Sequence, residues 1–306
     1  MATLAAQVPP AVDRSELLRD LRVLSADAME GREIGTPGSE RARAYVVERF
    51  HAVGLEPVAG TFVHPFATPT RGRAGGRPGG NVLGRLAGTK TPDQVLVISA
   101  HYDHVGVRGG EVFNGADDNA SGTAALFAIA RHFARHPPRH SLILAAFDGE
   151  ETGLIGAREF VRQPPVPRSA IRLNVNVDMI GRDADDVLYV VGTRAFPWLR
   201  PLIAGVASRA PVTLRMGHDD PANPREDWTR ASDHYAFMEA GIPALFFSVE
   251  DEEHHHRPSD DYETMTHDFY VRAVETIIDT ITVLDANGGV DPGTGLGAGG
   301  LVDAGS

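Results

Sequence analysis

Residues 141–153 read SLILAAFDGEETG, a buried-strand pattern that runs straight into a cluster of acids. Seven mostly apolar residues are followed at once by Asp148, Glu150 and Glu151. Three partly buried carboxylates repel one another unless they are paired or coordinated. Few lysine or arginine residues flank them, so a bound divalent cation is the more economical partner.

Two more apolar segments of the same kind predict the fold. QVLVISA runs up to His101, and IRLNVNV runs up to Asp178. Helical patterns separate the three strands, at residues 121–136 and 153–163. Apolar strands that alternate with helices are typical of a mostly parallel sheet covered on both faces. We therefore predict an α/β fold, with one globular domain built around a mostly parallel central sheet and helices on both faces.

The remaining pattern extends this domain over residues 1–286 and leaves residues 287–306 as a Gly-rich, disordered tail. A helix is expected from Asp13 to Leu24 with Asp13 as its cap, and another over 39–55 with Ser39 as cap and Gly54 as stop. Residues 64–80, rich in Pro, Gly and Arg, predict an exposed loop with an extended segment on each side. Later elements are expected as a strand at 186–192, a helix from Pro197, a strand at 242–249 and a helix at 267–286.

Composition narrows the function. The 306 residues are 42% hydrophobic and 23% charged, as in ordinary globular proteins. A net charge of −12 argues against a nucleic-acid partner, which needs a basic face. The absence of cysteine excludes disulfides, thiolate zinc sites and iron–sulfur clusters. No apolar run approaches a membrane span, and the N-terminus is no convincing signal peptide. We expect a cytoplasmic protein if the chain is complete, and a secreted or periplasmic one if a signal was removed.

Each of the three strands ends in residues that can bind metal, at the sheet edge where α/β folds bind ligands. His101 and Asp103 follow the first strand, and their spacing puts both side chains on one face. The carboxylate can then hydrogen-bond one ring nitrogen and leave the other for a metal. An isolated pair of this kind is more typical of a solvated loop; here the neighbouring strand ends add further ligands. His104 is assigned no role.

Two loops and the glutamate pair add further candidate metal-binding residues. NGADDNASG, residues 114–122, holds two adjacent acids before a helix, which is either a capped Asp-rich turn or a carboxylate that bridges two ions. EEHHHRPSDDYETM, residues 252–265, holds three consecutive histidines. Of the two glutamates after the second strand, one can be a ligand and the other a general base. Imidazole with carboxylates suits zinc, and also cobalt or manganese.

At this point the motifs resemble a known family. AHYDH, NGADDNASG, FDGEETGLIGA, NVDMIG and HHRPSD occur in the order and approximate spacing of the co-catalytic zinc aminopeptidases. That family also includes glutamate carboxypeptidases, glutaminyl cyclases and the catalytically silent transferrin receptors. MEGREIGTPGSERARAYVVERFHAVGLEP resembles the N-terminal helices of its compact bacterial members, and the similarity spans about residues 28–285.

The resemblance implies a site with two zinc ions, replaceable by cobalt or manganese. Asp118 would bridge the ions, with His101 and Asp178 completing one site, Glu151 and His256 the other, Glu150 acting as general base and Asp103 orienting His101. The family holds the bridging acid in a cis peptide, here Asp118–Asn119. Asp233 matches a family acid near the site, and His254 and His255 are alternatives to His256.

The implied activity is metal-assisted hydrolysis of the N-terminal residue of peptides that carry a free N-terminus. A glutaminyl-cyclase-like acyltransferase is the first alternative on the same scaffold. A carboxypeptidase is another, and it would need a cation such as Arg182, Arg225 or Arg230 to bind a C-terminal carboxylate. A binding protein with a dead site is disfavoured, because all five ligands are present.

Overall fold

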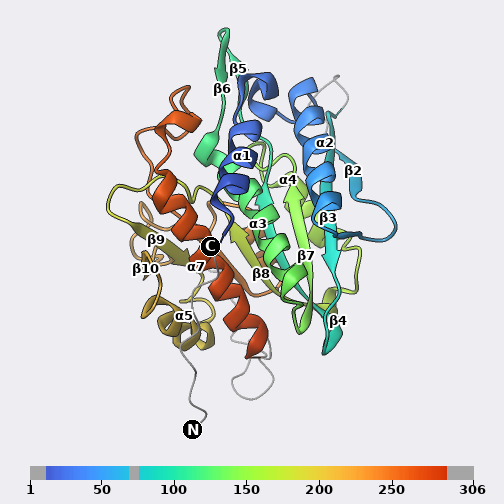
Figure 1. Cartoon of the computed structure of the whole chain (residues 1–306), viewed down its shortest axis with the longest axis vertical. Helices are drawn as coiled ribbons and strands as arrows, with labels where there is room; N and C mark the ends of the chain where they lie inside the picture. Colours follow the sequence, from blue (N-terminus) through green and yellow to red (C-terminus); the bar gives the residue numbers. More distant parts are fainter. Residues whose placement is uncertain (1–11, 69–75, 288–306) are drawn as a thin grey trace, which may run out of the picture.

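The computed structural model describes residues 12–68 and 76–287, and within them the chain folds around one large sheet (Figure 1). The strand order is β1-β3-β7-β4-β8-β11-β9-β10, with β2 paired to β3. The sheet strands are β1 Glu56–Pro57, β2 Val63–Ala67, β3 Pro78–Leu86, β4 Thr91–His101, β7 His140–Phe147, β8 Ile171–Val177, β9 Val187–Val191, β10 Thr213–Met216 and β11 Ala244–Ser248. A separate hairpin pairs β5 Gly106–Arg108 with β6 Glu111–Phe113.

Helices connect the strands. The α-helices are α1 Arg14–Leu24, α2 Pro37–Ala52, α3 Gly122–Arg135, α4 Ile155–Arg162, α5 Arg200–Ala207, α6 His234–Glu239 and α7 His267–Ala286. Short helical segments are η1 Asp27–Arg32, η2 Ala116–Ser121, η3 Arg168–Ala170, η4 Pro197–Leu199 and η5 Tyr262–Thr264. Over the described ranges, no helix combines the length and apolar character that crossing a bilayer demands.

The four middle strands, β7, β4, β8 and β11, run parallel to one another. Antiparallel pairing is confined to the flanks, where β3 pairs with β7 and β9 with β11. The carboxyl ends of the four parallel strands therefore lie at one edge of the sheet, as the sequence predicted.

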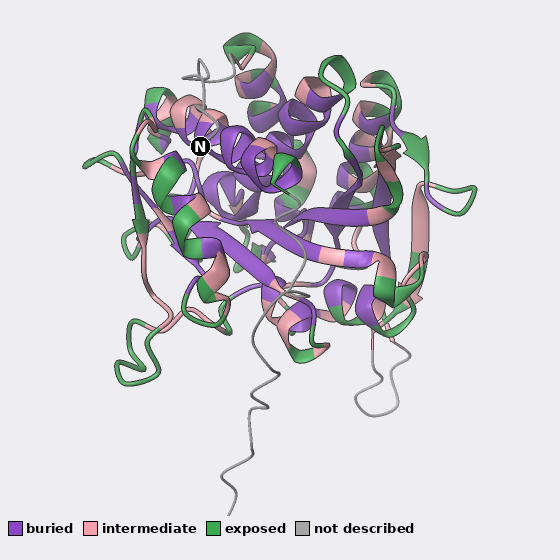
Figure 2. Ribbon diagram, turned by 90° about the horizontal axis from the view of Figure 1, so that it is seen from below, coloured by how far each residue is buried: buried purple, intermediate pink, exposed green. Residues whose placement is uncertain are grey.

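Alternation along β4 shows why its sequence reads as a continuous apolar run. Leu96 and Ile98 pack into the core with α1, α2, α3 and α7, whereas Val95 and Val97 pack into a second core with α4 and α6. Successive side chains of a strand point to opposite faces, so a strand covered on both sides needs apolar residues throughout. Figure 2 shows the strands buried between these helical layers.

The predicted α/β fold with a mostly parallel sheet is confirmed, but one cap is wrong. Asp13 caps α1 as expected, because its carboxylate accepts the backbone N–H groups of Ser15 and Glu16. Ser39 does not cap the second helix. That helix begins at Pro37, and the Thr36 hydroxyl accepts the backbone N–H of Ser39. Proline at the first helical position moves the start two residues earlier than expected.

The sequence did not predict β10 or the β5–β6 hairpin, each of which is only three or four residues long. The loop expected at residues 64–80 is shorter in the structure, because β2 and β3 pair antiparallel across it. The predicted C-terminal helix is confirmed over its full length, His267–Ala286. The predicted disordered tail, residues 287–306, lies outside the described residues except for Asn287.

A buried arginine ties the N-terminal segment to the edge of the sheet that carries the acids. The Arg32 guanidinium is fully buried and donates to four backbone carbonyl oxygens, those of Leu24, Tyr102, Asn114 and Gly115, at 2.6–2.9 Å. Burial lowers the pKa of Arg32 to about 10, which leaves it charged at neutral pH. One side chain thus joins the end of α1, the turn after β4 and the loop before η2.

We expect Arg32→Ala to lower the free energy of unfolding by at least about 3 kcal/mol, because the change removes four buried hydrogen bonds to carbonyl oxygens, of which only that of Gly115 also accepts the backbone N–H of Ala120 among the bonds of the described residues. Arg14→Ala is the control, since it removes only an exposed ion pair with Asp268 and should cost less than about 1 kcal/mol. Chemical denaturation of both variants tests this. Equal losses in the two variants would contradict a bracing role for Arg32.

Candidate metal centre

The structure brings all five predicted ligands to the carboxyl edge of the sheet. His101 is the last residue of β4, Asp178 directly follows β8, and Glu151 lies in the turn after β7. Asp118 comes from η2, before α3, and His256 from the loop after β11. Side chains separated by more than 150 residues therefore meet because parallel strands end at the same edge.

Three donors form a first group. His101 Nε2 lies 3.1 Å from Asp178 Oδ1 and 3.4 Å from Asp118 Oδ1. All three side chains are almost completely buried. His101 Nε2 and Asp178 Oδ1 nevertheless have no hydrogen-bond partner within the described part of the chain. Donor atoms that approach without hydrogen bonding one another are what two ligands of a common cation require, so this group fits a metal ion.

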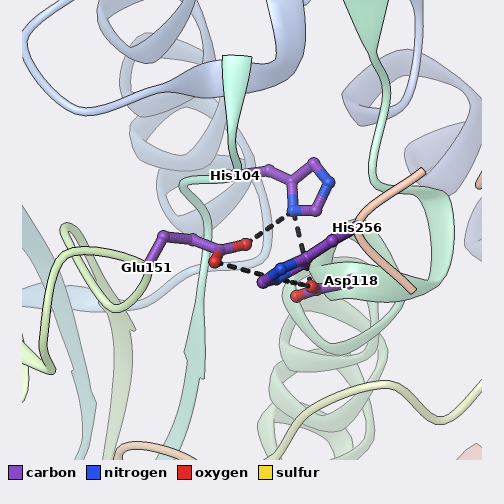
Figure 3. Close-up of side chains that lie close together, drawn as sticks. All are labelled: His104, Asp118, Glu151 and His256. Atoms are coloured by element: carbon purple, nitrogen blue, oxygen red, sulfur yellow. Dashed lines mark hydrogen bonds and ion pairs between the residues drawn. The ribbon is translucent and has the colours of Figure 1, made fainter. Parts of the chain in front are cut away.

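A second group shares the same aspartate (Figure 3). His256 Nε2 lies 3.2 Å from Asp118 Oδ2 and 3.0 Å from Glu151 Oε2. His104, to which the sequence assigned no role, joins them: its Nδ1 lies 2.7 Å from Glu151 Oε1 and 3.5 Å from Asp118 Oδ2. One donor atom from each of the four residues fits within 4.8 Å of the others.

Asp118 presents one carboxylate oxygen to each group, Oδ1 to His101 and Oδ2 to His104 and His256. The Asp118–Asn119 peptide bond is cis, as the resemblance implied. The backbone N–H groups of Asp117 and Asp118 both donate to the carboxylate of Asp260, at 2.9 and 3.0 Å. Asp260 is a positioning residue that the sequence did not single out, although it lies in the quoted HHRPSD motif.

The glutamate turn is held in the same manner by a carboxylate from the turn after β4. Asp103 accepts the backbone N–H groups of Glu150 and Glu151 at 3.0 and 3.4 Å. Its predicted hydrogen bond to His101 is longer than expected. His101 Nδ1 lies 3.6 Å from the Asp103 carboxylate and 3.1 Å from the Asp103 carbonyl oxygen, so the backbone makes the closer contact.

A buried chain of hydrogen bonds supports Asp178. Ser99 donates to Asn176, Asn176 donates to Ser232, and Ser232 donates to Asp178 Oδ2 at 2.6 Å. The final contact leaves Asp178 Oδ1 facing His101. Ser99 and Asn176 stand out in the sequence as polar residues inside apolar strands. Their hydrogen-bond partners lie on other elements, so the sequence alone does not predict this chain of hydrogen bonds.

The other histidines of the tract play different parts. His254 Nδ1 lies 3.0 Å from the Ser259 hydroxyl and belongs to neither donor group. His255 Nε2 approaches Asp118 Oδ2 to 3.5 Å, but it too belongs to neither group. His256 is thus the histidine of the tract that faces two carboxylates at once.

Asp233 lies buried beside the centre. Neither of its carboxylate oxygens has a hydrogen-bond partner among the residues that the structure describes. Burial is the main cause that raises its pKa to about 8; His101 opposes this rise, and Asp103 and Asp178 add to it. Burial also raises the pKa of Glu150 well above its usual value, with Asp233 among the acids that add to the effect. Neither acid belongs to a donor group.

The histidines and carboxylates of the centre each favour the charged form of the other, through shifts of their pKa values. Burial alone would raise the pKa of Asp118, but His104, His255 and His256 hold it well below its usual value. Hydrogen bonds to Asp118 and Glu151 raise the pKa of His256 to about 10. In the absence of a cation, protonated imidazoles would therefore neutralise these carboxylates.

A cavity of about 1380 Å³ opens onto the centre and is lined by Asp118, Glu150, Glu151 and Asp178. Its apolar wall includes Trp228, Tyr235 and Phe246, and its rim carries the acidic run from Glu250 to Glu253. Arg182, a candidate for binding a substrate carboxylate, is engaged: it pairs with Asp251 and lies 2.7 Å from Asp260. Arg225 and Arg230 line the cavity as well.

The sequence is similar to those of known peptidases. The model of Peptidase family M28 matches residues 81–281. A probable zinc metalloprotease of Pyrenophora teres f. teres is 29% identical over 214 residues, which cover 59% of this chain and 44% of that protein. The chain spans less than half the length of the curated relatives it matches.

Solved structures share the fold. A zinc aminopeptidase from Bacillus subtilis superposes with a TM-score of 0.69 at 17% identity, over 90% of this chain and 95% of that one. A glutaminyl cyclase from Bacteroides thetaiotaomicron bound to N-acetylhistamine superposes with a TM-score of 0.70 at 16% identity, over 90% and 99%. The fold is therefore common to proteins named for different reactions, and the site must distinguish them.

Metal uptake near neutral pH should release protons. Without a cation, His256 has a pKa of about 10 and carries a proton at pH 7, whereas an imidazole must be neutral to bind a metal. Apparent affinity should therefore rise with pH up to about 10. Calorimetric titration of zinc into the metal-free protein, in two buffers of different ionisation enthalpy, measures the released protons. An affinity that stayed constant from acid to neutral pH would contradict this.

Proposed function

This chain belongs to peptidase family M28, and from that membership we propose that it is a zinc-dependent aminopeptidase that hydrolyses the N-terminal residue of peptides. One observation carries the proposal. Two groups of imidazole and carboxylate donors share Asp118, and each fits a metal ion. Imidazole and carboxylate ligands with one bridging acid suit a pair of zinc ions.

We assign the ligands as the resemblance suggested. His101 and Asp178 would hold one ion, Glu151 and His256 the other, and Asp118 both. When bound, such ions supply Lewis-acid polarisation of a carbonyl and lower the pKa of water toward neutrality. The unpaired atoms His101 Nε2 and Asp178 Oδ1 support this assignment, since a buried polar atom without a partner is costly.

Glu150 is the proposed general base. It lines the cavity, lies next in sequence to the ligand Glu151, and stands outside both donor groups. Its raised pKa suits a carboxylate that takes a proton from water and returns it to the leaving amine. Because Asp103 holds the backbone N–H of both glutamates, the base and the neighbouring ligand keep a constant spacing.

The lining of the cavity favours a substrate with a free amino terminus. The carboxylates of Glu250, Glu252 and Glu253 supply negative charge to the lining of the cavity, which attracts a cationic α-amine. Binding a C-terminal carboxylate would need a cation. Arg182 is already paired with two acids, so Arg225 and Arg230 are the candidate cavity residues left for that role. The acidic lining supports aminopeptidase action.

Replacing the base should separate catalysis from metal binding. Glu150→Ala is expected to lower kcat by at least about a hundredfold, because general acid–base catalysis contributes about that much or more. Bound zinc, measured by mass spectrometry, should stay unchanged. Glu48→Ala is the control, since it removes an exposed acid of α2 that does not line the cavity. Normal turnover by the Glu150 variant would show that another group is the base.

A substrate panel tests the reaction itself. Aminoacyl-nitroanilides with a free amine should be cleaved, and their N-acetylated forms should not, because acetylation removes the positive charge. Cleavage of N-blocked peptides from the C-terminus would favour a carboxypeptidase. Release of ammonia from an N-terminal glutamine would favour a glutaminyl cyclase, the reaction for which one structural neighbour is named.

A further inference from the structure

We propose that His104 is a sixth metal ligand, which binds through Nδ1 at the ion held by Glu151 and His256. The inference rests on the proposed function, because it adds a residue to that metal centre. It makes the two sites unequal: one would have a single imidazole, from His101, and the other would have two, from His104 and His256.

The geometry of His104 parallels that of His256. Nδ1 of His104 faces Glu151 Oε1 at 2.7 Å and Asp118 Oδ2 at 3.5 Å, and Nε2 of His256 faces the same two side chains at 3.0 and 3.2 Å. Zinc bonds of 2.0–2.1 Å in a tetrahedral site place ligand atoms about 3.3 Å apart. The four measured separations bracket that value. Figure 3 shows both rings directed at the same pair of carboxylates.

Hydrogen bonding alone is a poor account of this arrangement. Both imidazoles face the same two carboxylates, so each would have to carry a proton on the facing nitrogen. One divalent cation at the point where the four donors meet would serve both rings in their neutral form and both carboxylates at once.

The surroundings of His104 leave its ring little freedom. The side chain is almost fully buried, and the ring lies edge-on to that of His256, with centroids 5.7 Å apart. Gly115 lies directly beside it: a Cβ there would come within 2.5 Å of the His104 ring, and φ of Gly115 is +55°. Arg32 donates to the carbonyl of Gly115 and so keeps this loop against the ring. A ring fixed in this way is preorganised for one ligand atom.

The end of β4 would then serve both ions. His101 points to the first group, and His104, three residues later, points to the second. Between them Asp103 holds the turn that carries Glu151. The four-residue segment from His101 to His104 therefore carries one ligand for each ion and the carboxylate that positions a third.

Cadmium NMR tests the assignment directly. The full chain, stripped of metal and labelled with NMR-active nitrogen in histidine, is loaded with an NMR-active cadmium isotope as a zinc substitute. Each coordinated imidazole splits the cadmium resonance by a one-bond coupling. We expect two cadmium signals, one split by a single histidine and the other by two. His104→Ala should reduce the second to a single coupling and weaken that ion's affinity by at least about a hundredfold.

His140→Ala is the matched control. His140 is also buried, and its Nδ1 lies 2.9 Å from the Asp285 carboxylate, but it begins β7 at the opposite end of the strand from Glu151. Both cadmium signals should survive this change even if the protein becomes less stable. Two bound ions with one histidine coupling each in the parent protein would overturn the role of His104 and leave the proposed function standing. Failure of the parent to bind cadmium at all would overturn both.

Discussion

The structure requires opposite charge close to the carboxylates that the parallel sheet gathers at one edge, because these carboxylates repel one another. Asp118, Glu150, Glu151 and Asp178 arrive there from three segments, and all but the Glu150 side chain, which lines the cavity, have a histidine nitrogen within 3.5 Å. Buried like charges are tolerated only when opposite charge lies close. Here the imidazoles supply counter-charge, and a cation held by the proposed ligands would supply more, so this requirement links the fold to the chemistry of the site.

The chain holds the acids in place with other acids and one arginine. Asp103 and Asp260 each accept two consecutive backbone N–H groups, one pair in the glutamate turn and the other in the turn that carries Asp118. Arg32 binds the carbonyl groups behind these turns. Backbone groups at irregular turns lack strand or helix partners, and a charged side chain that satisfies two to four of them fixes the turn firmly. The positions of Asp118 and Glu151 are therefore set largely through the backbone of the turns that carry them.

Much of this could be predicted from the sequence, because strand ends and short motifs carry the information locally. Apolar runs that end in His101, Asp148 and Asp178 indicated a parallel sheet and its functional edge. The sequence did not reveal His104, because an extra histidine beside a metal motif looks the same whether its ring faces solvent or a carboxylate. Asp260 was missed for the same reason: its partners, the backbone N–H groups of Asp117 and Asp118, lie more than 140 residues away. Short elements such as β10 depend on neighbours and leave little local pattern.

The grip of Asp260 on the Asp117–Asp118 turn also orders events during synthesis. Asp118 emerges from the ribosome early, but the Asp260 carboxylate that fixes its backbone and His256, which lies beside its carboxylate, follow more than 130 residues later. A nascent chain that has made its first strands and helices therefore carries Asp118 without the contacts of Asp260 and His256. Only when the segment from His256 to Asp260 has left the exit tunnel can His256 and Asp260 take their places around Asp118.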